Sequence, residues 1–84
     1  MILSSYPKID LHGMDQEYAL FKVNDFINDS LKLKYPKIVI IHGIGEGILR
    51  NATINYLKKD KRVLAYELDI MNPGCTIVTL KFDN

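Results

Sequence analysis

The sequence predicts an α/β domain, a two-layer sandwich in which two helices pack on a four-stranded mixed sheet. Three observations predict it. Residues 37–41 are an almost wholly apolar, β-branched run, as in a central strand. Apolar residues recur every three or four positions over 15–33, as on a helix. The apolar runs 63–70 and 75–82 flank the turn-forming residues 71–74, as in a hairpin. With a first strand at 8–12 and a second helix at 46–59, the order is β-α-β-α-β-β.

The N-terminal part of the chain contains a leader, a strand and a helix. Residues 1–7 are expected to form a loose leader, because Pro7 lacks an amide donor. Asp15 is the expected N-cap of the first helix. Six apolar residues form the buried face of that helix: Ala19, Leu20, Val23, Phe26, Ile27 and Leu31.

The two helices alternate with strands, and this order decides where the strand ends lie. Pro36 ends the first helix, because proline restricts the residue before it and donates no hydrogen bond. Strand-helix-strand units are parallel and right-handed by strong preference, so the first two strands should end at the same edge of the sheet. The second helix is expected to turn five residues inward: Leu49, Ala52, Thr53, Tyr56 and Leu57.

Length and composition indicate one small globular domain. The chain has 84 residues, of which 48% are hydrophobic and 25% charged, which is ordinary globular usage. We assign residues 8–84 to this domain. No apolar run approaches the roughly 18 to 20 residues that cross a bilayer, and the N-terminus lacks a signal-like pattern. The expectation is a cytoplasmic protein without membrane partners.

Charge and cysteine content exclude several classes of protein. The net charge is +1, too small for a strong nonspecific nucleic-acid binder, so any affinity for a polyanion must come from local placement of cations. The densest basic run, residues 58–62, lies at a predicted helix end, where the helix dipole favours cations. Cys75 is the single cysteine, which excludes an internal disulfide and a cysteine-based zinc site; we expect it in the core.

Two His-Gly motifs follow predicted strands, at residues 9–13 and 38–43. In the second motif, glycines recur at every second position where a helix should begin. Glycine lets a ligand approach the main chain, and a helix start offers unpaired amide donors to an anion. Phosphate is the expected ligand class, and the candidate phosphate-binding residues are Gly43, Gly45, Gly47 and Arg50, with Lys37 or Lys8 adding charge.

Asp10, His12 and His42 are the candidate catalytic residues. Asp10 and His12 share one face of a strand, where a carboxylate can fix the imidazole tautomer and raise its basicity for a general base. His42 could protonate the leaving oxygen or bind the phosphate. The alternative is that each histidine only bonds to loop backbone at a strand end. The three residues could also hold a divalent metal, but no metal-ligand spacing is present, and no cofactor is required.

The chain resembles the small MutS-related (Smr) domain family. The matching residues are Ile9-Asp10-Leu11-His12-Gly13 and His42-Gly43-Ile44-Gly45-Glu46-Gly47-Ile48-Leu49-Arg50, and the resemblance covers nearly the whole chain. It implies a fold like the C-terminal domain of the third bacterial translation initiation factor. It also implies an endonuclease or nucleic-acid-binding module, since some members nick DNA and others cleave messenger RNA at stalled or collided ribosomes. Ile44 stands where many relatives carry Lys or Arg.

Three functional interpretations follow. The first is an endonuclease on structured DNA or RNA, linked to DNA repair and recombination or to ribosome-associated RNA quality control. The second is a non-catalytic module of a larger protein that binds DNA, RNA or the ribosome. The third is an assembly domain, in which a free edge of the last strand pairs with another chain and Lys81 protects that edge only weakly. The isolated domain is expected to be a monomer.

Overall fold

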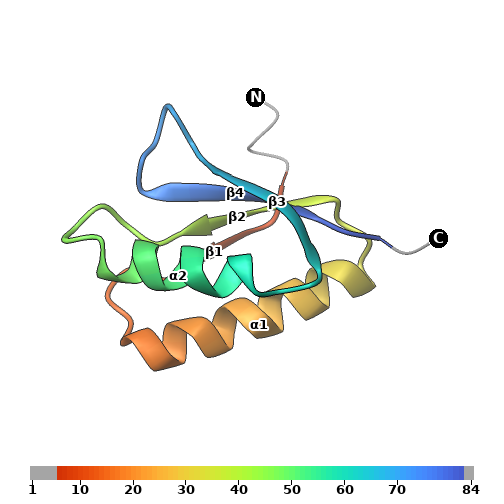
Figure 1. The fold of residues 1–84 in the computed structure, drawn as a ribbon, viewed down its shortest axis with the longest axis horizontal. Coiled ribbons are helices and arrows are strands. Elements are labelled where there is room, and N and C mark those ends of the chain that lie inside the picture. Colours follow the sequence, from red (N-terminus) through yellow and green to blue (C-terminus); the bar gives the residue numbers. More distant parts are fainter. Residues whose placement is uncertain (1–5, 83–84) are drawn as a thin grey trace.

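The predicted order of strands and helices is confirmed by a computed structural model, which describes residues 6–82 (Figure 1). The first five residues of the expected leader lie outside this range. Pro7 accepts a hydrogen bond at its carbonyl from Val39 N, at 2.9 Å, and so contacts the sheet. The elements are β1 (Lys8–Asp10), α1 (Gln16–Lys32), β2 (Lys37–Ile41), α2 (Ile48–Lys58), β3 (Val63–Leu68) and β4 (Cys75–Leu80).

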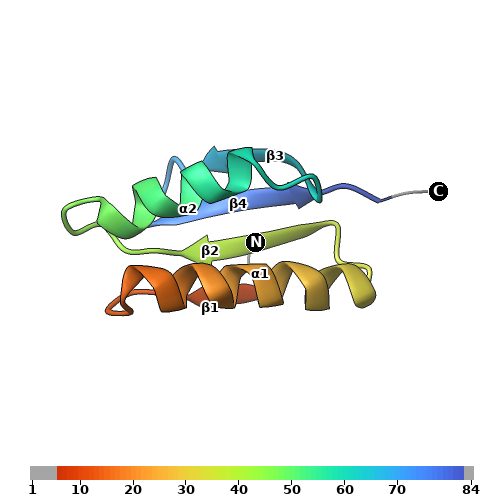
Figure 2. The ribbon, with the colours of Figure 1, turned by 60° about the horizontal axis from the view of Figure 1, so that its bottom comes forward.

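The sheet has the strand order β1-β2-β4-β3 (Figure 2). β1 and β2 are parallel, as predicted, and β4 is antiparallel to both β2 and β3. The expectation of a free edge along the last strand is therefore wrong. The chain turns back after β3 and inserts β4 between β3 and β2, so that β4 is hydrogen-bonded on both sides; the edge strands are β1 and β3.

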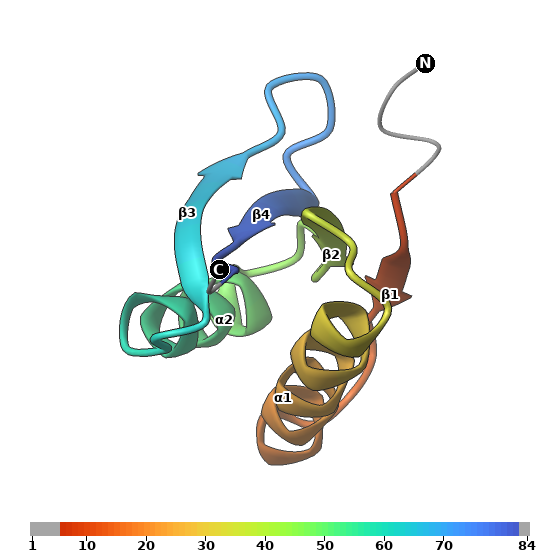
Figure 3. The ribbon, with the colours of Figure 1, turned by 90° about the vertical axis from the view of Figure 1, so that its right-hand side faces the viewer.

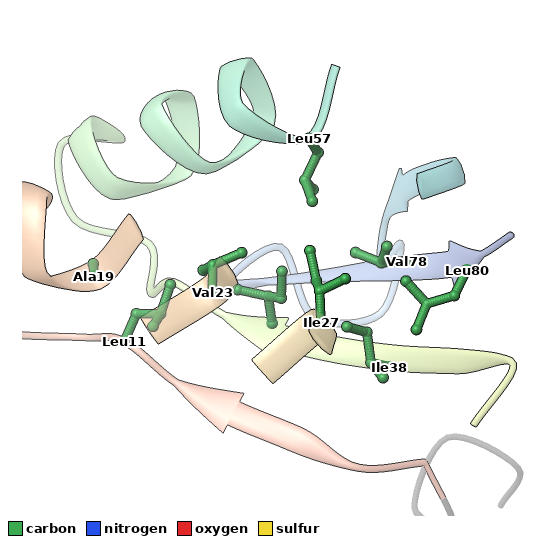
Figure 4. Close-up of a cluster of buried hydrophobic side chains, with 9 residues drawn as sticks. Leu11, Ala19, Val23, Ile27, Ile38, Leu57, Val78 and Leu80 are labelled. Carbon is green, nitrogen blue, oxygen red and sulfur yellow. The ribbon is translucent and has the colours of Figure 1, made fainter. Parts of the chain in front are cut away.

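Both helices cover one face of the sheet, which confirms the two-layer architecture (Figure 3). α1 begins after Asp15, whose side chain accepts a hydrogen bond from Glu17 N at 3.1 Å, as its predicted capping role requires. The core lies between the layers (Figure 4) and Cys75 is also buried, as predicted. Apolar residues from α1, β2, α2, β4 and the segment after β1 form this core: Leu11, Ala19, Val23, Ile27, Ile38, Ile40, Leu57, Val78 and Leu80.

α2 begins at Ile48, two residues later than predicted. Gly45 and Gly47 have φ angles of +30° and +82°, which lie in the left-handed region that an α-helix cannot use. The residues between β2 and α2 therefore form an irregular loop, and we call residues 43–47 the glycine loop. This loop is what the alternating glycines of the sequence produce.

A polar cluster fixes the far end of α2 against α1. Asn24 Oδ1 accepts hydrogen bonds from Tyr56 Oη at 3.0 Å and from Arg62 Nη2 at 2.7 Å. Arg62 also pairs with Asp60, with 2.6 Å between Nη2 and Oδ2. The Arg62 hydrogen bond holds the pKa of Asp60 below its ordinary value of 3.8. These contacts connect α1 to the C-terminal part of α2 and to the segment that follows it.

No helix of residues 6–82 has both the length and the apolar character needed to span a bilayer.

Thr53→Val should stabilise the fold. Thr53 is fully buried in α2, and its hydroxyl has no hydrogen-bond partner among residues 6–82. Valine has nearly the same shape and removes the unpaired oxygen, so the free energy of unfolding should rise by about 1 kcal/mol. Urea unfolding followed by circular dichroism measures it. Thr76→Val is the matched control and should destabilise the protein, because the Thr76 hydroxyl is hydrogen-bonded; equal effects of both substitutions would contradict this account.

Candidate nucleic-acid-processing site

The two His-Gly motifs meet at one edge of the sheet, as predicted. β1 and β2 end side by side, with Asp10 opposite Ile41, and Leu11 N donates to Ile41 O at 2.7 Å. A Cβ atom placed on Gly43 would lie 3.4 Å from His12 Cβ, so glycine permits this close approach. His12, Gly13 and residues 42–50 line one hollow of about 420 Å³.

Asp10 and His12 form an exposed pair at this edge. Asp10 Oδ1 accepts hydrogen bonds from His12 N at 3.1 Å and from His12 Nδ1 at 2.7 Å. A carboxylate only accepts, so Nδ1 carries a proton, and the lone pair of the neutral ring lies on Nε2. Nε2 has no hydrogen-bond partner within residues 6–82, and the His12 side chain is 74% exposed. Hydrogen bonding to His12 lowers the pKa of Asp10, which keeps this carboxylate ionised.

His42 is part of the same hollow, but its ring is enclosed. The residue is only 4% exposed. Its Nδ1 donates to Gly43 O at 2.9 Å, and in the neutral ring its Nε2 accepts from Thr76 Oγ1 at 2.8 Å. Both ring nitrogens are thus occupied by the protein, one of them by loop backbone as in the alternative interpretation of the sequence. The observed contacts of His42 link the end of β2 to β4 and orient the glycine loop.

Several backbone amides of the glycine loop and of the first turn of α2 have no protein acceptor among residues 6–82, although Gly47 itself is buried against Arg50. The amide of Gly43, predicted to bind phosphate, instead donates to Gly74 O at 3.0 Å, next to the bond from His42 N to the same oxygen at 2.9 Å. The seven amides of residues 44–50 donate to no protein acceptor within the described part of the chain. The last of them belong to the first turn of α2, where the helix dipole adds partial positive charge.

Arg50 lies over the glycine loop, whereas Lys37 does not reach it. A Cβ atom on Gly47 would lie 3.0 Å from Arg50 Nη2, which places the guanidinium against the loop. Lys37 begins β2 and is separated from His42 by the whole five-residue strand, about 16 Å at the usual rise. The prediction that Lys37 adds charge at the site is therefore corrected, because the strand carries Lys37 to the opposite edge of the sheet.

Within residues 6–82, no group of three His, Cys, Asp or Glu side chains is close enough to hold a metal ion. Asp10 and His12 are in contact, but the ring nitrogens of His42 face Gly43 and Thr76.

Two residues that build the site have no signal in the motifs. The Gly74 carbonyl and the Thr76 hydroxyl both hold the His42-Gly43 segment, and both come from the start of β4. Their contribution depends on β4 lying beside β2, where Ile41 is opposite Cys75. A strand order placing β4 at the sheet edge, as expected from the sequence, would not have identified them.

The geometry defines a small α/β domain in which His12, paired with Asp10, lines the same hollow as the glycine loop. The chain belongs to the Smr family: the family model, Smr domain, matches residues 9–81. Endonuclease MutS2 of Ligilactobacillus salivarius is 40% identical over 78 residues, 89% of this chain and 10% of that protein. Endonuclease MutS2 of Streptococcus suis is 34% identical over 77 residues, 88% of this chain and 10% of that protein. The chain thus spans about a tenth of the length of these curated relatives.

Among solved structures, the crystal structure of the Smr domain of Thermus thermophilus MutS2 is similar to this chain. Its TM-score is 0.87 at 29% sequence identity, and the match covers 89% of this chain and 98% of that domain. This likeness agrees with the four-stranded sheet and two helices described above.

Gly47→Ala should displace the Arg50 guanidinium, whereas Gly45→Ala should not. Both residues have a positive φ, which costs a residue with a Cβ about 1–2 kcal/mol, so both variants should lose stability. At Gly47 the new methyl also meets Arg50 Nη2, the far end of a flexible side chain that can move away, while at Gly45 nothing lies within 4 Å. Urea unfolding measures the two losses, and the NMR signal of Arg50 Nε–H reports the displacement. An Arg50 signal that is unchanged in Gly47→Ala would show that Arg50 is not held against the loop.

His12→Ala should raise the pKa of Asp10 toward the ordinary 3.8, because it removes the largest cause of the depression. Since the folded pKa is depressed, the stability contributed by this pair is present above the unfolded pKa and is lost as pH falls through the folded pKa. Carboxyl ¹³C NMR across an acid titration measures the shift. Arg50→Ala is the control and should leave the titration of Asp10 in place; an unchanged Asp10 titration in His12→Ala would contradict the observed pair.

Proposed function

We propose that this domain is a nuclease that cleaves phosphodiester bonds in structured DNA or in RNA. Membership of the Smr family and similarity to proteins named Endonuclease MutS2 support a nuclease-type or nucleic-acid-binding domain. The observation that carries the proposal is the exposed Asp10–His12 pair beside the unpaired amides of residues 44–50. A base and a set of anion donors in one hollow are what phosphodiester cleavage needs.

In this proposal, His12 is the general base. Its Nε2 takes a proton from water or from a ribose 2′-hydroxyl, and the resulting oxygen attacks the phosphorus. The phosphorus–oxygen bond to the leaving group breaks, and the leaving oxygen takes up a proton from solvent or from the protonated His12 ring. Asp10 holds Nδ1–H and stabilises the imidazolium that forms.

The glycine loop and Arg50 have the electrostatic role. In this proposal the amides of residues 44–50 donate hydrogen bonds to the phosphoryl oxygens, whose negative charge grows during the reaction, and Arg50 supplies the cation. Losing one such preorganised donor costs about 3 kcal/mol in other systems. His42 is a positioning residue in this mechanism, because its buried ring holds Gly43 and Thr76 and reaches substrate only through the loop.

A second function, binding of DNA, RNA or the ribosome without cleavage, is favoured by one observation. Ile44 is 63% exposed on the glycine loop, at the position where the resemblance to the Smr family implies Lys or Arg. An apolar side chain at that position supplies no charge for a scissile phosphate. Both the nuclease and the binding module are compatible with a role in DNA repair or in ribosome-associated RNA quality control.

Cleavage by the purified domain should fall by at least about 100-fold in His12→Ala, because a general base contributes that much or more. The assay uses labelled branched DNA and single-stranded RNA, with and without a chelator. Asp10→Asn should also lower the rate, since it weakens the orientation of Nδ1–H. Lys22→Gln, on the outer side of α1, is the control and should cleave at the parental rate. Retarded but intact substrate with the parental protein would favour the binding module, and undiminished cleavage by His12→Ala would refute the mechanism.

A further inference from the structure

Charge is divided between the two ends of the long axis of the molecule. At one end α1 and α2 finish and β2 begins, and hydrogen bonds from Leu80 N to Pro36 O and from Lys81 N to Arg62 O hold these segments together (Figure 1). Among residues 6–82, eight of the eleven basic residues lie there with the carboxylates Asp29 and Asp60, for a formal charge of +6. We call the eight residues the basic end: Lys32, Lys34, Lys37, Lys58, Lys59, Lys61, Arg62 and Lys81.

The end that carries the glycine loop has the opposite sign. Arg50 is the one Lys or Arg there among the described residues, against five carboxylates, for a formal charge of −4 with neutral histidines. A nucleic acid approaching this end meets net repulsion. The acidic residues are Asp10, Asp15, Glu17, Glu46 and Asp69.

The basic end carries more positive charge than the helix ends and ion pairs of the fold compensate. Two helices finish there, and each contributes a partial charge of about −0.5, so helix dipoles compensate about one cation in total. Asp60 compensates Arg62 through its 2.6 Å ion pair. Lys58, Lys59 and Lys61 are exposed and form no ion pair with a described carboxylate. Like charges this close repel one another, which an external polyanion would relieve.

The surface between the two ends favours one path for such a polyanion. α2 contains no acidic residue, and its exposed side presents Asn51, Asn55 and Lys58 in a row from the glycine loop to the basic end. α1 runs between the same ends but carries Glu17, Asp25 and Asp29. At the far end of α2, Tyr56, Lys59, Asp60 and Lys61 line a hollow of about 470 Å³. The ammonium groups of Lys59 and Lys61 can bind a phosphate, and the ring of Tyr56 can contact a base.

We propose that the basic end is the surface that binds the phosphate backbone of the nucleic acid, and that the outer face of α2 leads the strand from there to the glycine loop. The class of ligand rests on the proposed function. The basic end supplies most of the affinity, and the glycine-loop end supplies the chemistry. Salt screens charges beyond about 10 Å, so cations about 16 Å away along α2 cannot offset repulsion at the glycine loop itself. The two tasks are therefore separated in space.

The separation sets a minimum ligand length. The 11 residues of α2 span about 16 Å, which corresponds to about five base pairs at 3.4 Å each. A duplex of four base pairs, about 14 Å long, is shorter than this span, whereas a duplex of about 20 base pairs exceeds it. The longer ligand should therefore bind much more tightly.

The test measures binding of a fluorescent duplex of about 20 base pairs by anisotropy over a range of salt concentrations. Lys59→Gln/Lys61→Gln should weaken binding by about tenfold at low salt and make the slope of log K against log salt shallower by about 1.8, or 0.9 per lost phosphate contact. The matched control Lys22→Glu changes the net charge by the same amount outside the basic end and should change affinity by less than about twofold. Equal losses in the two variants would overturn the proposal.

Two further arms separate this inference from the proposed function. His12→Ala should bind the duplex as tightly as the parental protein, even if no variant cleaves, because binding and cleavage are assigned to different ends. Vesicles of phosphatidylcholine and phosphatidylserine in equal amounts test an anionic membrane surface instead. Vesicle binding that depends on Lys59 and Lys61, without binding of the duplex, would overturn the assignment to nucleic acid.

Discussion

The Gly74 carbonyl oxygen is the contact on which the site depends. It accepts hydrogen bonds from both His42 N and Gly43 N, and so fastens the chain leaving β2 to the start of β4. His42 reinforces this attachment through Thr76. The backbone after Gly43 belongs neither to β2 nor, before Ile48, to α2. The amides of residues 44–50 therefore have no protein acceptor in the described part of the chain. In our proposal these amides bind the anion, and they lack such acceptors because the hydrogen bonding of the sheet ends at Gly43.

The two histidines illustrate how burial divides similar residues into different tasks. Both follow strands and precede glycine, but β1 lies at the sheet edge and β2 lies inside it. His12 is therefore exposed, paired only with Asp10 and left with a basic nitrogen, whereas His42 has both nitrogens bonded inside the protein. Charge is divided in a similar way. The end with the Asp10–His12 pair is acidic, and the basic end, which we propose binds polyanions, lies at the opposite end of the sheet. Small size does not prevent this domain from separating binding and chemistry.

Local patterns in the sequence predicted the local structure well. The three- and four-residue spacing and the Asp15 cap identified α1, and the His-Gly repeats identified the edge where β1 and β2 end. Contacts between distant segments were not predictable, because neither spacing nor residue type reveals that β4 inserts between β2 and β3. The placement of Lys37, the occupied amide of Gly43 and the roles of Gly74 and Thr76 all follow from that insertion and from strand direction. The later start of α2 follows from backbone angles that only the folded loop defines.

The most direct measurement is a titration of the ¹⁵N-labelled domain with inorganic phosphate, followed by amide and imidazole NMR signals. The account predicts that the amides of residues 44–50 and the ring of His12 shift together along one binding curve, while the Gly43 amide, held by Gly74, shifts little. It also predicts that His12 in the neutral form carries its proton on Nδ1. Two results would contradict the central claim. One is that the glycine-loop amide signals do not shift while other amide signals do, and the other is a neutral His12 ring that carries its proton on Nε2.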